Sequence, residues 1–398
     1  MFCKATAAVS DGERKCYHVG TVRILAIDVG TGTQDILLFD SAQALENALQ
    51  LIMPSPTQIA AGRIRRATEG GQAVFLTGVI AGGGPCHWAL EDHLRAGAQA
   101  FATHEAAATF DDDLENVERM GVTLVSEDEA KSLAAQRVEL RDLDLEAIRI
   151  ALAAFDVDTD FDALALGCLD HGAAPPGYSD RLFRFDHLRH VVEERNDLRA
   201  FAFRPAELPD YLTRARTLVA CVDTSAPVVF LDTGPAAALG ALQDPEVAQS
   251  DEQLILNLGN MHALAFHVRG TQILSLYEHH TGEMTRGQIE DFTERLMAGT
   301  LAHDEVFGSK GHGVFYAREE RGARSKEQGG RPLIAVTGPQ RSRLRGSRLE
   351  PYFAAPHGDM MVAGCFGLLW AFAERYPEHR EEITAALGVV ATDAAVGL

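Results

Sequence analysis

The sequence is poor in cysteine, has no long apolar run and carries no excess of positive charge. Its six cysteines are scattered without a Cys-x-x-Cys pair, which argues against a cysteine zinc site and fits a reducing cytoplasm. No apolar stretch approaches the roughly 20 residues of a membrane span. The longest, residues 362–373, contains glycines and predicts a buried helix. The formal net charge of −21 argues against nucleic acid or anionic membrane as partners.

The remaining composition is that of a globular protein large enough for two domains. Its 398 residues are 46% hydrophobic, which suffices for a core in each domain. Helix and strand signals alternate as far as residue 169, with a strand expected at 121–125 and a helix at 127–135, and this predicts α/β layers. A second strand-rich block begins at residue 253. We therefore expect an irregular N-terminal extension over residues 1–21, a first α/β domain over 22–249 and a second over 250–398.

A glycine turn between two β-prone runs is the most informative local pattern. The runs are residues 24–27 and 36–39, and the turn contains Gly30, Thr31, Gly32 and Thr33. Glycine lets a ligand approach the main chain, and the N–H groups of such a turn can converge on an anion. Asp28, at the end of the first run, is placed to hold a hydrated Mg²⁺. The pattern predicts a nucleotide phosphate site, and the alternative is an ordinary hairpin turn.

Two other glycine motifs for nucleotides do not fit this turn. A Rossmann site needs a third glycine and a following helix, whereas a strand follows here. A Walker loop needs Gly-Lys-Ser/Thr, which is absent. Two similar turns occur later in the chain: Asn257-Leu258-Gly259-Asn260 follows a predicted strand and precedes another, and Thr337-Gly338-Pro339 ends the apolar strand 333–336.

The order of these motifs resembles that of the actin, sugar kinase and Hsp70 ATPase superfamily. Asp28-Val29-Gly30 with Asp35 is similar to its first phosphate motif, most closely in the hydantoinase/oxoprolinase branch. Thr233-Gly234-Pro235-Ala236 resembles an element that precedes the second phosphate motif, here residues 257–260. The resemblance implies a two-domain α/β actin-like ATPase (ribonuclease H-like) fold with an interdomain nucleotide cleft. It further implies ATP and Mg²⁺ as cofactors, with Asp28 as the metal-holding residue. The implied nucleotide-binding residues are Gly30, Thr31, Gly32, Thr33, Gly259, Asn260, Thr337, Gly338 and Pro339.

The sequence is most similar to a prokaryotic family labelled as pyruvate formate-lyase activating enzymes. The likeness spans residues 23 to about 373 and includes the Gly82-Gly83-Gly84 turn, Asp170-His171-Gly172 and Gly311-His312-Gly313. The activity in that label does not fit the chain. A radical enzyme of that kind needs a Cys-x3-Cys-x2-Cys run to hold an iron–sulfur cluster, and the sequence has none.

Several histidines lie beside glycine, threonine or asparagine in predicted turns: His171, His262, His279, His280 and His312. Histidine is the side chain most often used for proton transfer near neutral pH and for binding metals. We expect Asp170, His171, His279 and His312 to join Asp28 as catalytic residues in the cleft. The alternative is that these histidines only bond to the backbone of their loops. His279 and His280 are adjacent on a predicted strand and face opposite ways, so at most one reaches the site.

These observations favour an ATP-binding enzyme, either a phosphotransferase or an ATP-driven hydrolase, that acts on a small polar substrate in the cleft. Asn257 departs from the superfamily, which usually has aspartate there, and asparagine can neither act as a base nor supply charge to a metal. A catalytically reduced nucleotide-binding regulatory protein is therefore one alternative. A metal-dependent hydrolase that uses the histidine turns is another. The substrate and the oligomeric state are not readable from the sequence.

Overall fold

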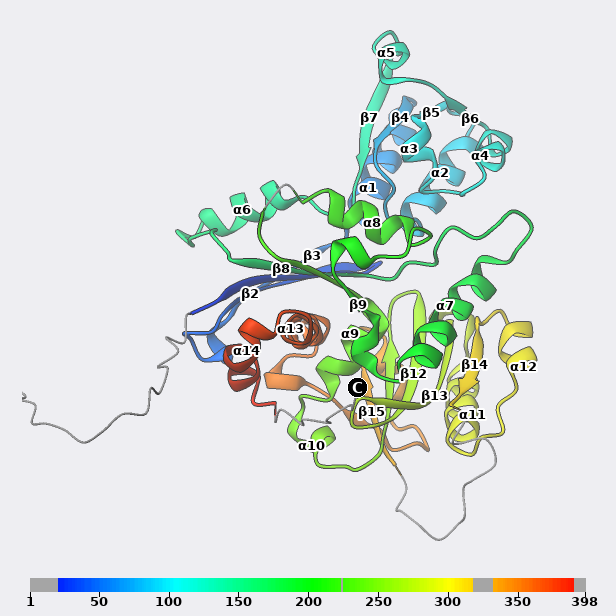
Figure 1. Cartoon of the computed structure of the whole chain (residues 1–398). Coiled ribbons are helices and arrows are strands. Elements are labelled where there is room, and N and C mark those ends of the chain that lie inside the picture. Colours follow the sequence, from blue (N-terminus) through cyan, green and yellow to red (C-terminus); the bar gives the residue numbers. More distant parts are fainter. Residues whose placement is uncertain (1–20, 223–224, 318–331, 390–398) are drawn as a thin grey trace, which may run out of the picture.

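The computed structural model describes residues 21–222, 225–317 and 332–389, which form two six-stranded sheets and one four-stranded sheet (Figure 1). The expected N-terminal extension lies almost wholly outside the described residues. None of the helices in the described part of the chain is long and apolar enough to cross a bilayer.

The first six-stranded sheet is built on the predicted glycine hairpin. Its strand order is β3-β2-β1-β8-β10-β9, and β1 pairs antiparallel with β2 and parallel with β8. Ile24, Ile27, Ile36 and Phe39 are all buried, as their β-prone runs predict. The strands are β1 (Arg23–Val29), β2 (Thr33–Asp40), β3 (Leu49–Pro54), β8 (Ala163–Cys168), β9 (Ala202–Phe203) and β10 (Val228–Asp232).

The second six-stranded sheet repeats this arrangement. Its order is β14-β13-β12-β11-β15-β16, with β11 antiparallel to β12 and parallel to β15. Each sheet thus contains three antiparallel strands and two parallel ones in the order 3-2-1-4-5, with one more edge strand, β9 in the first sheet and β14 in the second. This repeat defines the two-domain actin-like ATPase fold expected from the sequence. The strands are β11 (Gln253–Leu258), β12 (His262–Arg269), β13 (Gln272–His280), β14 (Gly313–Tyr316), β15 (Leu333–Thr337) and β16 (Tyr352–Phe353).

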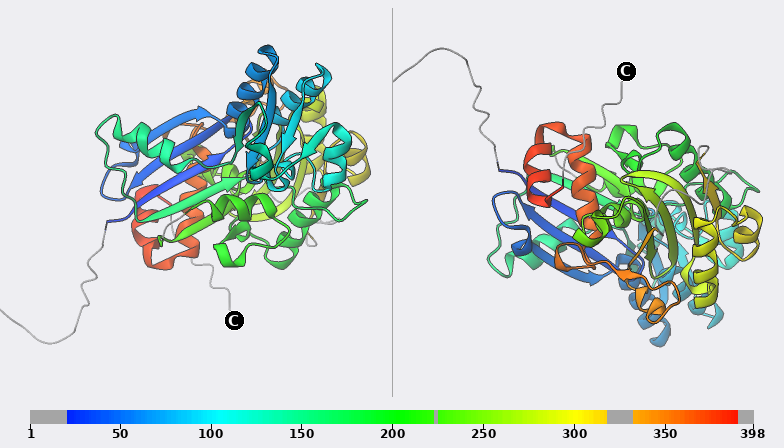
Figure 2. Two further views of the ribbon diagram at one scale, coloured as in Figure 1. Left: turned by 90° about the horizontal axis from the view of Figure 1, so that it is seen from above. Right: turned by 90° about the horizontal axis from the view of Figure 1, so that it is seen from below.

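Two helices, α9 (Thr233–Ala241) and α13 (Ala363–Arg375), pack between the two sheets (Figures 1 and 2). Glycines allow their close approach. A methyl group at Gly240 would lie 1.8 Å from the Ala363 carbonyl oxygen, and one at Gly367 would lie 1.9 Å from that of Ala236. The expected boundary at residue 249/250 separates the two sheets along the chain, whereas α13 returns from the C-terminal part to pack on β1, β8 and β10.

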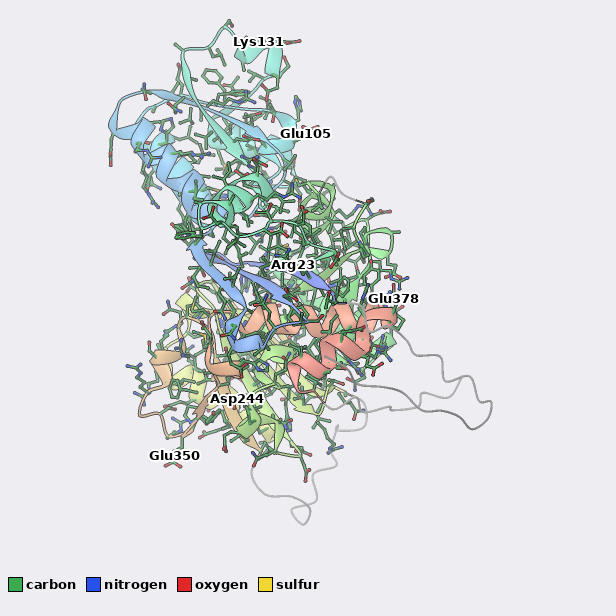
Figure 3. All side chains as sticks on the ribbon, turned by 90° about the vertical axis from the view of Figure 1, so that its left-hand side faces the viewer. Arg23, Glu105, Lys131, Asp244, Glu350 and Glu378 are labelled. Atoms are coloured by element: carbon green, nitrogen blue, oxygen red, sulfur yellow. The ribbon has the colours of Figure 1, made fainter. Side chains whose placement is uncertain are left out.

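The four-stranded sheet is inserted between β3 and β8 and has its own apolar core. All its strands are parallel, in the order β6-β5-β4-β7, and it projects from the body of the molecule at the end marked by Glu105 and Lys131 (Figure 3). Its elements are α1 (Pro56–Glu69), β4 (Ala73–Gly78), α2 (Pro85–Arg95), β5 (Ala100–Ala102), α3 (His104–Ala107), α4 (Leu114–Met120), β6 (Val122–Leu124), α5 (Glu127–Ala130) and β7 (Ala135–Leu140).

The helix expected over residues 127–135 is wrong in its second half. The helix α5 ends at Ala130, and Ala135 begins β7, where it pairs with Ala73. Val138 and Leu140 are buried and alternate with exposed residues, which is the two-residue period of a strand. The remaining helices are α6 (Leu145–Ala153), α7 (Asp180–Glu194), α8 (Thr213–Ala220), α10 (Pro245–Ala248), α11 (Arg286–Met297), α12 (His303–Gly308) and α14 (Arg380–Leu387).

Candidate functional site

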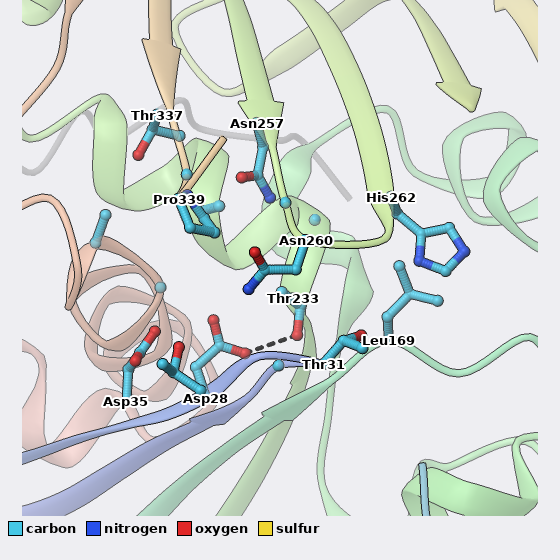
Figure 4. A pocket seen from close by; sticks show the side chains of 18 of the residues that line it. Asp28, Thr31, Asp35, Leu169, Thr233, Asn257, Asn260, His262, Thr337 and Pro339 are labelled. Carbon is cyan, nitrogen blue, oxygen red and sulfur yellow. Dashed lines mark hydrogen bonds between the residues drawn. The ribbon is translucent and has the colours of Figure 1, made fainter. Parts of the chain in front are cut away.

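A pocket with a cavity volume of about 110 Å³ lies where the glycine turns of the two sheets face each other (Figure 4). Eight of the nine residues predicted to bind nucleotide line it, as does Asp28; the eight are Gly30, Thr31, Thr33, Gly259, Asn260, Thr337, Gly338 and Pro339. The ninth, Gly32, lies against the Asn260 side chain, and a methyl group there would come within 2.0 Å of the Asn260 Nδ2 atom.

The two facing turns have the same backbone geometry. The Gly30 N–H donates to the Thr33 carbonyl over 3.0 Å, and the Gly259 N–H donates to the His262 carbonyl over 2.9 Å. Glycine is required at both positions, because a methyl group would lie 2.9 Å from the carbonyl oxygen of Thr33 in one turn and 2.8 Å from that of His262 in the other. The molecule thus carries two copies of one tight hairpin on opposite walls of the pocket.

Two carboxyl groups lie at the base of the first turn. Asp28 and Asp35 are paired across β1 and β2, and the Thr233 hydroxyl donates to the Asp28 Oδ1 atom over 2.6 Å. Burial raises the pKa of Asp28 to about 6. Burial, reinforced by the charge of Asp28, raises the pKa of Asp35 to about 8. The buried Asp35 Oδ1 atom accepts no hydrogen bond from the described residues.

Arg214, on α8, lines the pocket and was not found from the sequence. Its guanidinium donates to Asp142 Oδ2 and to the Leu169 carbonyl, both over 2.6 Å. The predicted triple-glycine turn packs against it, since a methyl group at Gly82 would lie 2.6 Å from Arg214 Nη2. A lone arginine in a helix has no local signal, because its place in the pocket depends on contacts distant in sequence.

The opposite wall carries neutral side chains. Asn257 lines the pocket near the end of β11, where the superfamily usually has an acid. Its amide oxygen lies against the next turn: a methyl group at Gly338, whose φ is +91°, would come within 2.6 Å of it. In Figure 4, Asn257, Asn260 and Thr337 face Asp28 and Asp35 across the pocket.

The structure brings two of the predicted histidines, His171 and His312, together with His262 and His280. The His171 and His262 Nε2 atoms are 3.1 Å apart. The His312 ring lies 5.3 Å from that of His171 and 4.7 Å from that of His280, measured between centroids. His262 also lines the pocket and joins the cluster to it. We call His171, His262, His280 and His312 the histidine cluster.

His279 does not join the histidine cluster. Its ring bonds to the Ser309 hydroxyl over 3.2 Å and lies beside Phe292 on the opposite face of β13. The predicted alternation along this strand is therefore correct, but His280 rather than His279 reaches the cluster.

Asp170 fixes the turn that carries His171. It is buried, and its two carboxylate oxygens accept hydrogen bonds from the Gly172 N–H over 2.8 Å and the Ala215 N–H over 2.9 Å. Both oxygens are therefore occupied by the backbone, and the geometry gives Asp170 a positioning role.

A buried ion triad lies behind the histidine cluster. Arg184, which is 0% exposed, donates to Asp232 Oδ2 over 2.5 Å and to Glu278 Oε2 over 3.2 Å. Asp232 also accepts the Gly234 N–H and so caps the N-terminus of α9. The triad itself was not predicted, because its members are separated along the chain.

The strand order and the facing turns place the chain in the actin-like ATPase superfamily. Within it, the chain belongs to the family described as "Putative pyruvate format-lyase activating enzyme (DUF1786)", whose model matches residues 81–343, about two-thirds of the chain. No curated protein sequence matches the chain.

Solved structures of related fold are distant in sequence. The chain is similar to a Listeria monocytogenes protein described as "Lmo2764 protein, a putative N-acetylmannosamine kinase", at 11% identity and a TM-score of 0.34, over 89% of this chain and 99% of that one. It is similar to a Ppx/GppA family member of Aquifex aeolicus at 9% identity and a TM-score of 0.28, over 93% and 88%. It is also similar to the ethanolamine utilization protein EutJ of Carboxydothermus hydrogenoformans, at 12% identity and a TM-score of 0.27, over 88% of this chain and 89% of that one. TM-scores this low do not support a fold on their own, and the fold is identified from the strand order of the two sheets.

Proposed function

We propose that the chain binds ATP with Mg²⁺ in this pocket and is a phosphotransferase or an ATP-driven hydrolase of a small polar molecule. The observation that carries the proposal is the pair of facing glycine turns with a buried carboxyl pair at the base of one of them. Backbone N–H groups of glycine turns can bind phosphate oxygens without a broad basic surface. Such a local site agrees with the chain's strong net negative charge.

The donor set fits a hard divalent cation. Asp28 and Asp35 face each other across two strands, and the Asp35 Oδ1 atom lacks a hydrogen-bond partner among the described residues. Oxygen ligands of this kind suit Mg²⁺, which keeps several of its waters. A bound cation would favour the ionised carboxylates, whose pKa values burial raises. Bound ATP would supply the phosphoryl group, and Mg²⁺ would offset the negative charge on it.

The remaining walls suit the rest of the nucleotide. Thr337, Gly338 and Pro339 end β15 at the pocket, and Met360 and Met361 lie beside them. The Gly338 N–H donates to the Met360 sulfur over 3.2 Å, so the turn is held against an apolar side chain. Methionine adapts to flat aromatic rings, which fits an adenine. Arg214 and Thr233 complete the phosphate side of the pocket.

Asn257 supports a second candidate function, a regulatory protein that binds the nucleotide and does not hydrolyse it. An amide replaces the second acid, so only the first wall carries carboxylates. The two candidates share the nucleotide site and differ in phosphate release. Steady release of ADP and phosphate, with or without an added acceptor, supports the enzyme. Binding without release over hours supports the regulatory protein.

The test of the nucleotide site is a thermal-shift series with ATP, ADP and AMP, with and without Mg²⁺. We expect ATP to raise the melting temperature only with Mg²⁺, since a ligand of the native state stabilises it by mass action. Asp28→Ala should reduce the shift measured from its own ligand-free baseline. Asp128→Ala, which removes an exposed acid of the inserted sheet, is the matched control. The proposal would be overturned if none of the three nucleotides changed the melting temperature of the folded protein.

A further inference from the structure

Three histidines of the cluster come from segments far apart in the chain and place a ring nitrogen each close to the other two. His171 follows β8, His262 begins β12 and His312 precedes β14, yet one nitrogen of each lies within 4.8 Å of the others. Tetrahedral Zn²⁺ with Zn–N bonds of about 2.0–2.1 Å separates its nitrogens by about 3.3 Å. The observed 3.1 Å between the His171 and His262 Nε2 atoms agrees with that spacing.

His312 provides a second and independent observation. Its side chain is 0% exposed, and neither ring nitrogen has a hydrogen-bond partner among the described residues. Buried polar atoms are almost always bonded, and an imidazole without a partner at either nitrogen is costly. A metal ion at the centre of the three rings would satisfy one of these nitrogens with a bond stronger than a hydrogen bond.

The surroundings fix the three ligands and offset the nearest positive charge. Arg184 is bound by the carboxylates of Asp232 and Glu278, so the triad as a whole is not cationic when both acids are ionised. The backbone at each ligand is tied down: the Gly172 N–H beside His171 donates to Asp170 over 2.8 Å, and the Gly259 N–H donates to the His262 carbonyl over 2.9 Å. The His312 N–H donates to the Glu278 carbonyl over 2.9 Å. Preorganised ligands lose little freedom on binding.

We propose that His171, His262 and His312 bind a Zn²⁺ ion, with a fourth position open to water or to an oxygen atom of the second substrate. Three histidines with an open position are the arrangement of catalytic rather than structural zinc. The site lies beside the nucleotide pocket through His262, which contributes to both. His280 is the nearest additional ring, 4.9 Å from that of His262. This site is separate from the proposed Mg²⁺ position at Asp28 and does not depend on it.

The experiment uses the full chain, stripped with a chelator and titrated with Zn²⁺ and with Co²⁺ in the absence of nucleotide. We expect one equivalent of Zn²⁺ by elemental analysis, and visible absorption bands of four- or five-coordinate Co²⁺ that Zn²⁺ abolishes. Substitutions His312→Gln and His171→Gln should each weaken Zn²⁺ binding by more than ~100-fold, since even outer partners of zinc ligands are worth 10–100-fold. His279→Gln, on the opposite face of the same sheet, should bind as the wild type does.

Two outcomes would overturn the site. One is a folded wild-type chain, checked by circular dichroism, that takes up no stoichiometric Zn²⁺ or Co²⁺. The other is Zn²⁺ affinity that is equal in wild type, His312→Gln and His171→Gln. The Co²⁺ spectrum of the wild type tests the ligand set even where a variant fails to fold. Because no nucleotide is added, failure here leaves the ATP proposal standing, and failure of the thermal-shift test leaves the zinc site standing.

Discussion

The turn after β1 and the turn after β11 have the same backbone geometry, but only the first carries acidic side chains. Both close with a glycine N–H that donates to a carbonyl three residues on, over 3.0 and 2.9 Å. The first carries Asp28 paired with Asp35, whereas the second carries Asn257 paired with Leu264. The comparison indicates that the tight glycine turn is duplicated and the negative charge is not. A metal–phosphate ligand placed between the turns would meet its carboxylates on one wall alone.

The largest effect should come from breaking the shared backbone geometry. Gly30→Ala and Gly259→Ala each force a methyl group to within 3 Å of a backbone carbonyl, so we expect each to lower the free energy of unfolding by about 1–3 kcal/mol. Gly287→Ala is the control. No atom lies within 4 Å of that added methyl group, and its position in α11 should make the change stabilising by about 0.5–1 kcal/mol. Urea denaturation measures all three, and a similar loss at Gly287 would contradict the turn argument.

The next largest effect compares the contributions of the acidic wall and the neutral wall to Mg²⁺-dependent ATP binding. Asp28→Asn should reduce the Mg²⁺-dependent part of the ATP affinity about tenfold or more, which is about 1.4 kcal/mol. Asn257→Ala should leave that Mg²⁺-dependent part unchanged, because asparagine supplies no charge. Calorimetric titration with ATP at several Mg²⁺ concentrations gives both values. Equal losses in the two variants would show that the walls are not asymmetric toward the metal.

A third prediction concerns pH and the first wall alone. The pKa of Asp35 is raised from 3.8 to about 8, so the folded chain keeps a proton that the unfolded chain releases near pH 4. The associated stability is complete below about pH 4 and is lost as the pH rises toward 8. Asp35→Asn removes this loss. We expect it to raise the stability at pH 9 by about 1 kcal/mol or more, relative to its effect at pH 4.

Denaturation of wild type and Asp35→Asn at pH 4, 6 and 9 without divalent ions checks this slope. The same comparison at Asn257, which has no titratable group, should give a flat difference across pH. A difference between wild type and Asp35→Asn that does not change with pH would contradict the shifted pKa.

The smallest effect tests the contact between the two turns. A methyl group at Gly32 would meet the Asn260 side chain, which is flexible at that end, so Gly32→Ala should cost less than about 1 kcal/mol. Removal of the amide by Asn260→Ala should abolish that cost. A double-mutant cycle of the two substitutions measures the coupling, and strict additivity would show that the turns do not touch in solution.

Much of the local structure was predictable, because its signals lie within short windows of sequence. Two β-prone apolar runs on either side of a glycine turn predicted the hairpin of β1 and β2. Where two signals competed the prediction was wrong: residues 131–135 look helical, yet pairing of Ala135 with Ala73 places that end in a strand. The parallel inserted sheet was missed as a unit, since each of its strands pairs with a partner distant in sequence.

The candidate site likewise contains some residues that the sequence could predict and others that it could not. The glycine turns were found because close approach of the backbone restricts the residue at one position, and that restriction is visible locally. The choice of His280 over His279 needed the strand's orientation, which depends on what covers each face of the sheet. Arg214 and the Arg184 triad gave no signal, because a single charged residue in a helix looks the same whether it is exposed or buried.

The sequence by itself therefore determined the hairpins, their glycine turns and the acid at the base of the first one, and with them the class of fold. These features depend on dihedral freedom and on apolar, β-prone residues at a few neighbouring positions. Tertiary structure alone decided that the turns face each other across a pocket, that α13 returns to the first sheet, and that His171, His262 and His312 meet. Those contacts join residues 50 or more positions apart, and burial between packed sheets sets both their geometry and their charge states.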